Sequence, residues 1–168
     1  MRPLVQVGTQ APDFELDGTD GTPEGRRTFT LSEFRGSPVV LIFYPEDNTV
    51  VCTEQLTSYT ADLSIFGQVG AKVLALSPQS VESHEGFAGL HGPFGFPLLA
   101  DTDLEVGEAY GILGPLGFYR RSAVVIDPDG IVVFAYRSIT GLSFRSATEL
   151  AEVVRGFRDA AAADEPGR

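Results

Sequence analysis

The chain has 168 residues, the length of one ordinary domain and enough to bury a hydrophobic core. Its 23 acidic and 12 basic residues leave a net charge of −11, which disfavours binding to nucleic acid or to an anionic membrane surface. The single cysteine, Cys52, excludes an intramolecular disulfide and a thiolate zinc cage. Because the sequence shows neither a membrane-spanning apolar run nor a signal peptide, we expect a soluble, cytoplasmic protein.

The first part of the chain predicts a hairpin followed by a central strand. Residues 12–16 alternate between apolar and polar, a turn-rich loop covers 17–25, and an extended pattern resumes at 28–30. Residues 31–34 predict a single helical turn. The continuous apolar run at 38–44 is typical of a strand that is buried on both faces.

Helices and strands alternate through the middle of the chain. Apolar residues recur at spacings of mostly three to five between Thr49 and Gly70, which predicts an amphipathic helix with Cys52 in its first turn. The elements predicted next are a strand at 72–76, a helix at 80–90, a strand at 96–100 and a helix at 104–110.

The last part of the chain adds antiparallel strands and a closing helix. Residues 122–126 and 131–136 flank a hairpin turn, and 147–160 form an amphipathic helix. We therefore expect one domain at 1–160 and a flexible tail at 161–168. The element order predicts an α/β, thioredoxin-like fold, with a mixed central sheet flanked by helices and an N-terminal β-hairpin. A doubly wound open sheet is the alternative.

In either topology, the loop that leaves the carboxyl end of the central strand is the favoured position for a site. Here that loop leads to Cys52, in the first helical turn, where unpaired N–H groups and the helix dipole favour the nucleophilic thiolate. Thr49 can cap the helix or present its hydroxyl beside the sulfur. Pro45 fixes the direction of the chain and can wall one side of a pocket. Without further signals, a lone cysteine is more often an inert buried side chain.

The spacing Pro45-x-x-x-Thr49-x-x-Cys52 resembles the active-site motif of the peroxiredoxins, the alkyl hydroperoxide reductase/thiol-specific antioxidant family. The stretches Val7-Gly-Thr-Gln-Ala-Pro-Asp-Phe-Glu-Leu and Phe96-Pro-Leu-Leu-Ala-Asp are similar to other parts of that family. The resemblance covers about residues 7–157 and is strongest to the bacterioferritin-comigratory-protein (peroxiredoxin Q) subgroup.

The same resemblance implies a catalytic arginine. Members carry an arginine before a small hydroxyl residue and an apolar strand that ends in an Asp-x-x-Gly turn, and the segment from Arg121 to Gly130 matches this pattern. Arg120 is the rival, because neighbouring strand residues point to opposite faces. The implied catalytic residues are thus Cys52, Thr49, Arg121 and Pro45.

The activity implied is thiol-dependent reduction of hydrogen peroxide and organic hydroperoxides through a Cys52 sulfenic acid. Where the subgroup often has a resolving cysteine this chain has Thr57, so a one-Cys mechanism with an external reductant is implied, either a thioredoxin-like protein or a low-molecular-weight thiol. We expect no cofactor, no metal, no nucleic-acid or membrane partner, and a monomer or homodimer. The alternative is a peroxide sensor or scaffold protein on the same fold that does not turn over.

The chain departs from the family pattern at two places, and its two histidines give no sign of a metal site. Gln55 stands where many relatives have a glutamate, so it brings no charge to the site. Val50 and Val51 replace a smaller pair and are expected to narrow access or to favour an apolar peroxide. His84 and His91 lack ligand spacing, and we expect both to be solvated surface residues.

Overall fold

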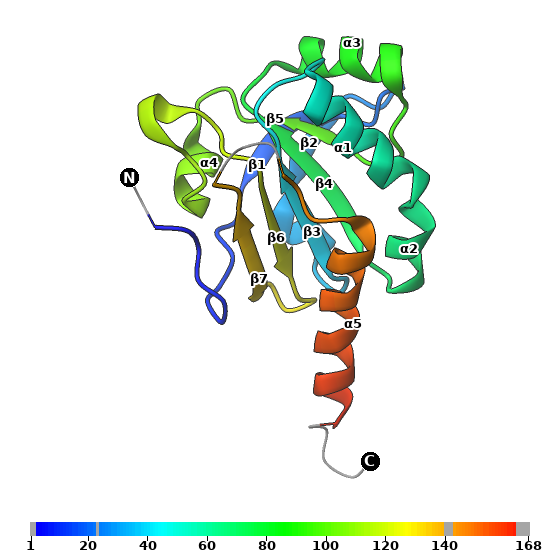
Figure 1. The fold of residues 1–168 in the computed structure, drawn as a ribbon, viewed down its shortest axis with the longest axis vertical. Helices are drawn as coiled ribbons and strands as arrows, with labels where there is room; N and C mark the ends of the chain where they lie inside the picture. Colours follow the sequence, from blue (N-terminus) through cyan, green and yellow to red (C-terminus); the bar gives the residue numbers. More distant parts are fainter. Residues whose placement is uncertain (1–2, 23, 140–142, 164–168) are drawn as a thin grey trace.

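The computed structural model describes residues 3–22, 24–139 and 143–163. Across these residues a mixed sheet with the order β2-β1-β5-β4-β3-β6-β7 forms the centre of the molecule (Figure 1). Its strands are β1 (Glu15–Thr19), β2 (Arg27–Thr30), β3 (Val39–Phe43), β4 (Lys72–Ser77), β5 (Leu98–Ala100), β6 (Ser122–Ile126) and β7 (Val132–Arg137). The α-helices are α1 (Val50–Ala61), α2 (Leu63–Gln68), α3 (Val81–His91), α4 (Glu105–Tyr110) and α5 (Ala147–Ala163), and the 3-10 turns are η1 (Leu31–Phe34) and η2 (Pro115–Gly117).

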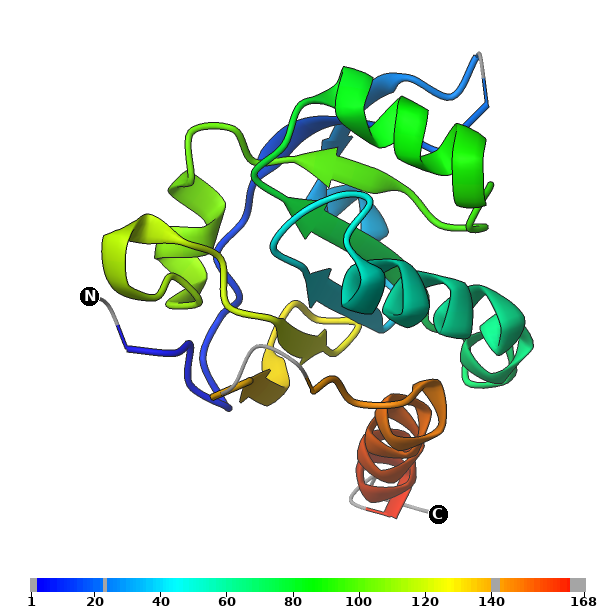
Figure 2. The same cartoon turned by 45° about the horizontal axis from the view of Figure 1, so that its top comes forward.

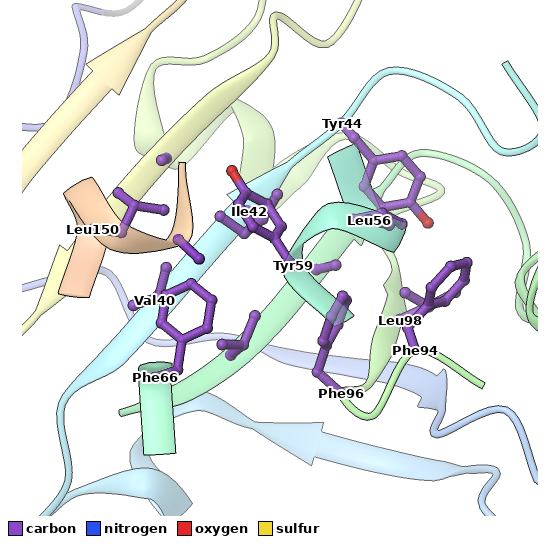
Figure 3. Packing of buried hydrophobic residues seen from close by; sticks show 14 of the residues in the cluster. Val40, Ile42, Tyr44, Leu56, Tyr59, Phe66, Phe94, Phe96, Leu98 and Leu150 are labelled. Atoms are coloured by element: carbon purple, nitrogen blue, oxygen red, sulfur yellow. The ribbon is translucent and has the colours of Figure 1, made fainter. Parts of the chain in front are cut away.

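Helices cover both faces of the sheet (Figure 2). Side chains of α1, α2, α3 and α5 pack with β3 and β4 into one buried cluster, part of which Figure 3 shows. A second cluster on the other face is formed with α4, η1 and the segment before β1. The sheet is thus a central layer between two apolar layers, as expected for a thioredoxin-like fold.

The central strand β3 is buried along its whole length, which explains its continuous apolar sequence. It pairs in parallel with β4 and antiparallel with β6. In the second pairing Phe43 lies opposite Ser122. The chain leaving the carboxyl end of β3 therefore passes beside the residues that enter β6. This register brings the loop that leads to Cys52 close to Arg121.

The predicted mixed sheet with its N-terminal hairpin is confirmed, and the antiparallel β3–β6 and β6–β7 pairs exclude the doubly wound alternative. The single helix predicted from Thr49 to Gly70 is wrong in one respect, because the chain turns at Asp62 and divides it into α1 and α2. Helix α5 continues to Ala163, and residues 164–168 of the predicted tail lie outside the described residues. The domain boundaries stay a prediction.

Candidate active site

Cys52 lies in the first turn of α1, directly after the loop that leaves β3. The backbone of Thr49 is extended, and α1 begins at the next residue, Val50. The first N–H groups of a helix have no partner within the helix and carry a partial positive charge, which stabilises an anion at this position. The side chain of Cys52 is fully buried, with 0% of its surface exposed.

Arg121 meets the cysteine from the neighbouring strand. Its Nη2 donates to Sγ of Cys52 at 3.2 Å, and its side chain is buried. Arg120, the rival candidate, is half-buried, and its Nη2 lies 3.5 Å from the carbonyl oxygen of Ile139. A hydrogen bond from a guanidinium to sulfur favours the thiolate over the thiol. Of the two neighbours, the structure therefore brings Arg121 to the cysteine.

The guanidinium of Arg121 is held by a chain of hydrogen bonds along α1. Its Nη1 donates to Oε1 of Gln55 at 2.5 Å, and Nε2 of Gln55 donates to the hydroxyl of Tyr59 at 3.2 Å. That hydroxyl in turn donates to the carbonyl oxygen of Arg145 at 2.5 Å. Cys52, Gln55 and Tyr59 are three and four residues apart and so share one face of the helix. Burial raises the pKa of Tyr59 to about 12, which keeps its hydroxyl protonated.

Thr49 and Pro45 lie in the loop between β3 and α1. The Thr49 hydroxyl donates to the carbonyl oxygen of Glu46 at 3.2 Å and makes no side-chain cap to the helix. Of its two possible roles, side-chain capping is therefore absent, because the hydroxyl oxygen accepts no hydrogen bond from the first N–H groups of α1. Pro45 is half-buried immediately after Tyr44. Both residues lie where the sequence placed them, at the entrance to the helix that carries the cysteine.

A second polar group, which the sequence analysis missed, surrounds the carboxylate of Asp47 in the same loop. The hydroxyls of Tyr44 and Ser83 donate to its two oxygens, each at 2.7 Å. Nδ1 of His84 lies 2.7 Å from Oδ2, and the Asp47 N–H donates to Oε1 of Gln79 at 2.5 Å. This set, Tyr44, Asp47, Gln79, Ser83 and His84, is called the Asp47 network below.

The prediction that His84 is a solvated surface residue is wrong, since its side chain is fully buried. The signal was its spacing: Val81, His84, Phe87 and Ala88 lie on the face of α3 that meets the sheet. His91, by contrast, is exposed as predicted. No group of three histidine, cysteine or acidic side chains placed to hold a metal occurs among the described residues. Those residues also include no helix long and apolar enough to cross a bilayer.

A model of the AhpC/TSA family matches residues 7–135, a span that contains Pro45, Thr49, Cys52 and Arg121. The chain belongs to the AhpC/TSA family. It is 34% identical over 136 residues to "Peroxiredoxin Q, chloroplastic" of Sedum lineare. The aligned region covers 80% of this chain and 70% of that protein. It is 37% identical over 137 residues to "Selenocysteine-containing peroxiredoxin PrxU" of Peptoclostridium acidaminophilum, covering 77% and 66%.

The fold of this family member agrees with a solved peroxiredoxin. The reduced 2-Cys peroxiredoxin of Plasmodium vivax superposes with a TM-score of 0.87 at 25% identity, over 94% of this chain and 99% of that one. The expected function, a thiol-dependent peroxidase, is confirmed by these relatives. The single cysteine of the sequence is consistent with a one-Cys type.

Proposed function

We propose that Cys52 is the nucleophile of this peroxidase, and that Arg121, Thr49 and Pro45 form the site in which it attacks peroxide. The observation that carries the proposal is the 3.2 Å hydrogen bond from Nη2 of Arg121 to Sγ of Cys52. It joins a cation to a thiol in the first turn of a helix, and each of these surroundings favours the thiolate.

In the first half-reaction the Cys52 thiolate attacks the terminal oxygen of ROOH. An S–O bond forms, the O–O bond breaks, and RO⁻ leaves and takes a proton to become ROH. Sulfur is oxidised to the sulfenic acid, and the peroxide is reduced to an alcohol, or to water when R is hydrogen. The negative charge that moves onto the leaving oxygen is what the site has to stabilise.

The surrounding groups have separate tasks in this step. Arg121 holds the thiolate, and its fork of N–H donors can also bind a peroxide oxygen. The Thr49 hydroxyl and the N–H groups at the start of α1 belong to the segment that leads to Cys52, and in this proposal they orient the peroxide. Such positioning matters because the nucleophilicity of a thiolate decreases as its thiol becomes more acidic.

In the second half-reaction an external thiol R′SH attacks the sulfenic acid, releasing water and forming a mixed disulfide with Cys52. A second thiol then releases Cys52 as the thiol, with R′SSR′ as product. Reductants of the thioredoxin-like type or low-molecular-weight thiols fit this scheme. The identity of the reductant, the absence of nucleic-acid and membrane partners, a cytoplasmic location and a monomeric or homodimeric state stay predictions.

Burial of the sulfur suggests a preference for small peroxides. The Cys52 side chain is fully enclosed, and the half-buried Val51 precedes it. We therefore expect hydrogen peroxide to react faster than cumene hydroperoxide. Val51→Gly should raise the rate for the bulky substrate more than for the small one, and an unchanged ratio would contradict this view.

The proposed nucleophile can be tested by stopped-flow oxidation of the pre-reduced protein with a slight excess of hydrogen peroxide. Mass spectrometry should find one added oxygen on Cys52, at a rate orders of magnitude above that of a free cysteine, and Cys52→Ser should abolish the reaction while remaining folded. A rate no greater than that of free cysteine would contradict the proposal.

Steady-state assays with excess thiol distinguish an enzyme, which consumes many equivalents of peroxide, from the sensor or scaffold alternative, which stops after one.

A further inference from the structure

The Asp47 carboxylate is buried close to the active site and takes no part in the reaction described above. Only 5% of the residue surface is exposed. A buried carboxylate is costly unless hydrogen bonds and an opposite charge compensate it. Here Tyr44 and Ser83 donate to it through their hydroxyls, and His84 lies at hydrogen-bond distance. So well-supported a buried group in an active-site loop requires an explanation.

The geometry of His84 indicates that it supplies the opposite charge. Its Nε2 lies 2.9 Å from the carbonyl oxygen of Leu99, which can only accept, while its Nδ1 faces the carboxylate of Asp47 at 2.7 Å. When Asp47 is ionised, both contacts are hydrogen bonds only if both ring nitrogens carry protons, which makes the ring an imidazolium. Burial and the neighbouring Asp47 charge raise the pKa of Tyr44 well above its ordinary value, so its hydroxyl remains a donor to the same carboxylate.

The pair connects the active-site loop to three other parts of the fold. Asp47 belongs to the loop between β3 and α1, and His84 belongs to α3. Through Nε2, His84 is also bound to Leu99 of β5, and the backbone N–H of Asp47 is bound to Gln79, which follows β4. The loop is thus fixed at its middle, two residues before Thr49 and five before Cys52.

We propose that the buried Asp47–His84 ion pair positions the active-site loop, so that Thr49 and the first turn of α1 are held in the geometry that peroxide attack requires. The inference rests on the proposed role of Cys52 as the nucleophile. Asp47 and His84 act through the backbone of the loop and are positioning residues. A misplacement of about 1 Å in such a site can cost roughly 100-fold in rate.

The test compares Asp47→Asn, His84→Gln and the double variant in the full-length protein. Matched controls are Asp103→Asn and His91→Gln, which change an exposed aspartate and the exposed histidine of the same helix. We expect each single variant to react with hydrogen peroxide about 10- to 100-fold more slowly than wild type, and the controls to match wild type. The double variant should be no slower than the slower single one, because the two residues act as a unit.

A second readout distinguishes positioning from a general loss of structure. Alkylation of Cys52 by iodoacetamide needs access to the sulfur but not the arrangement that binds peroxide. If the loop is released, alkylation should become faster while oxidation by peroxide becomes slower. Circular dichroism and urea unfolding would establish that each variant is folded under the assay conditions. Parallel decreases in both reactions would overturn the proposal, because they would indicate a less nucleophilic thiolate.

The charge of the pair can be measured directly. Ring ¹⁵N shifts should show His84 as an imidazolium at pH 7, with His91 as an exposed reference in the same spectrum. A neutral His84 ring would overturn the ion pair.

Milder variants keep the proposal testable if Asp47→Asn or His84→Gln does not fold. Tyr44→Phe and Ser83→Ala each remove one donor to Asp47 and preserve the surrounding packing, and each should slow oxidation about three- to tenfold. Wild-type oxidation rates in folded Asp47→Asn and His84→Gln would overturn the positioning role alone. Wild-type protein that reacts no faster than free cysteine would instead overturn the proposed function.

Discussion

Two groups of side chains support Cys52, and they affect the sulfur in different ways. Arg121 touches Sγ directly and is held by Gln55 and Tyr59. The contacts of the Asp47 network, in contrast, fix the loop before the cysteine. The first group contains a cation that is bound to the sulfur and to an amide oxygen, whereas the second places a buried histidine against a buried carboxyl group.

The difference suggests that stabilising the thiolate and placing it are separate tasks here. Loss of the Arg121 group should make the sulfur less reactive toward any electrophile, because less thiolate is stabilised. Loss of the Asp47 network should instead make the sulfur easier to reach but slower with peroxide. The ratio of alkylation to oxidation therefore reports which group a substitution has damaged.

The largest effect is expected for Arg121→Ala, which removes the hydrogen bond from Nη2 to Sγ of Cys52. Oxidation by hydrogen peroxide should slow by roughly 100- to 1000-fold, the usual cost of losing one donor to developing charge in an active site. Alkylation should not become faster. Stopped-flow and iodoacetamide assays check both, with Arg120→Ala as the matched control that remains within about twofold of wild type. Equal losses in the two variants would contradict the assignment of strand faces.

The next effect concerns pH, because each group contains a buried tyrosine. Burial raises the pKa of Tyr59 to about 12, and the pKa of Tyr44 also lies well above its ordinary value. Below pH 10 both are protonated in the folded and the unfolded chain, and their contribution to stability is constant. Above pH 10 the unfolded chain releases these protons first, so the free energy of unfolding should fall by about 1.4 kcal/mol per pH unit for each tyrosine until its folded pKa is reached.

Urea unfolding at pH 9, 10 and 11 checks this decline, and Tyr59→Phe provides the control because it should reduce the slope. A stability that is constant or increasing between pH 9 and 11 would show that these hydroxyls are not buried donors.

A smaller effect is expected at Gln55, which orients Arg121 without sharing its charge. Gln55→Ala removes this acceptor from Nη1 and should slow oxidation about tenfold, since the guanidinium then loses one of the hydrogen bonds that orient it. Gln55→Glu retains an acceptor at the same position and should stay within about threefold of wild type. If the alanine variant were as fast as the glutamate variant, the amide would have no orienting role.

The smallest effect on rate is expected for Tyr59→Phe, two hydrogen bonds away from the sulfur. It removes the donor to the Arg145 carbonyl and should lower the free energy of unfolding by about 1 to 2 kcal/mol, with oxidation within about threefold of wild type. Urea unfolding and stopped-flow oxidation of the same sample separate the two. A loss of rate as large as that of Gln55→Ala would mean that the whole chain of hydrogen bonds determines the position of Arg121.

The residues along one short segment could be placed from the sequence because their geometry is local. Pro45, Thr49 and Cys52 follow a buried strand and begin a helix, and their spacing alone puts the thiol in the first turn. Arg121 required more, because adjacent strand residues point to opposite faces. The resemblance favoured Arg121, and the β3–β6 register explains why it reaches the sulfur.

The Asp47 network could not be assembled in this way, because its members come from segments that meet only in the folded chain. As an isolated polar residue in the sequence, His84 predicts a surface position, although its spacing to Val81 and Phe87 indicates the buried face of α3. What paired it with Asp47 is the packing of α3 beside the loop. The break between α1 and α2 at Asp62 was likewise hidden, because the apolar spacing continues across it.

The antiparallel pairing of β3 with β6 also has a consequence for when the protein becomes active during its synthesis on the ribosome. The thiol and its arginine are 69 residues apart in the chain, and they meet only after a non-local strand pair has formed. Such pairings are slow steps in folding, because a long segment must be ordered before they form. A partly synthesised chain that carries Cys52 but not yet β6 would thus have an ordinary, slowly oxidised thiol. Rapid reaction with peroxide would begin only after β6 has paired with β3. The appearance of activity would therefore report when this late step of folding takes place.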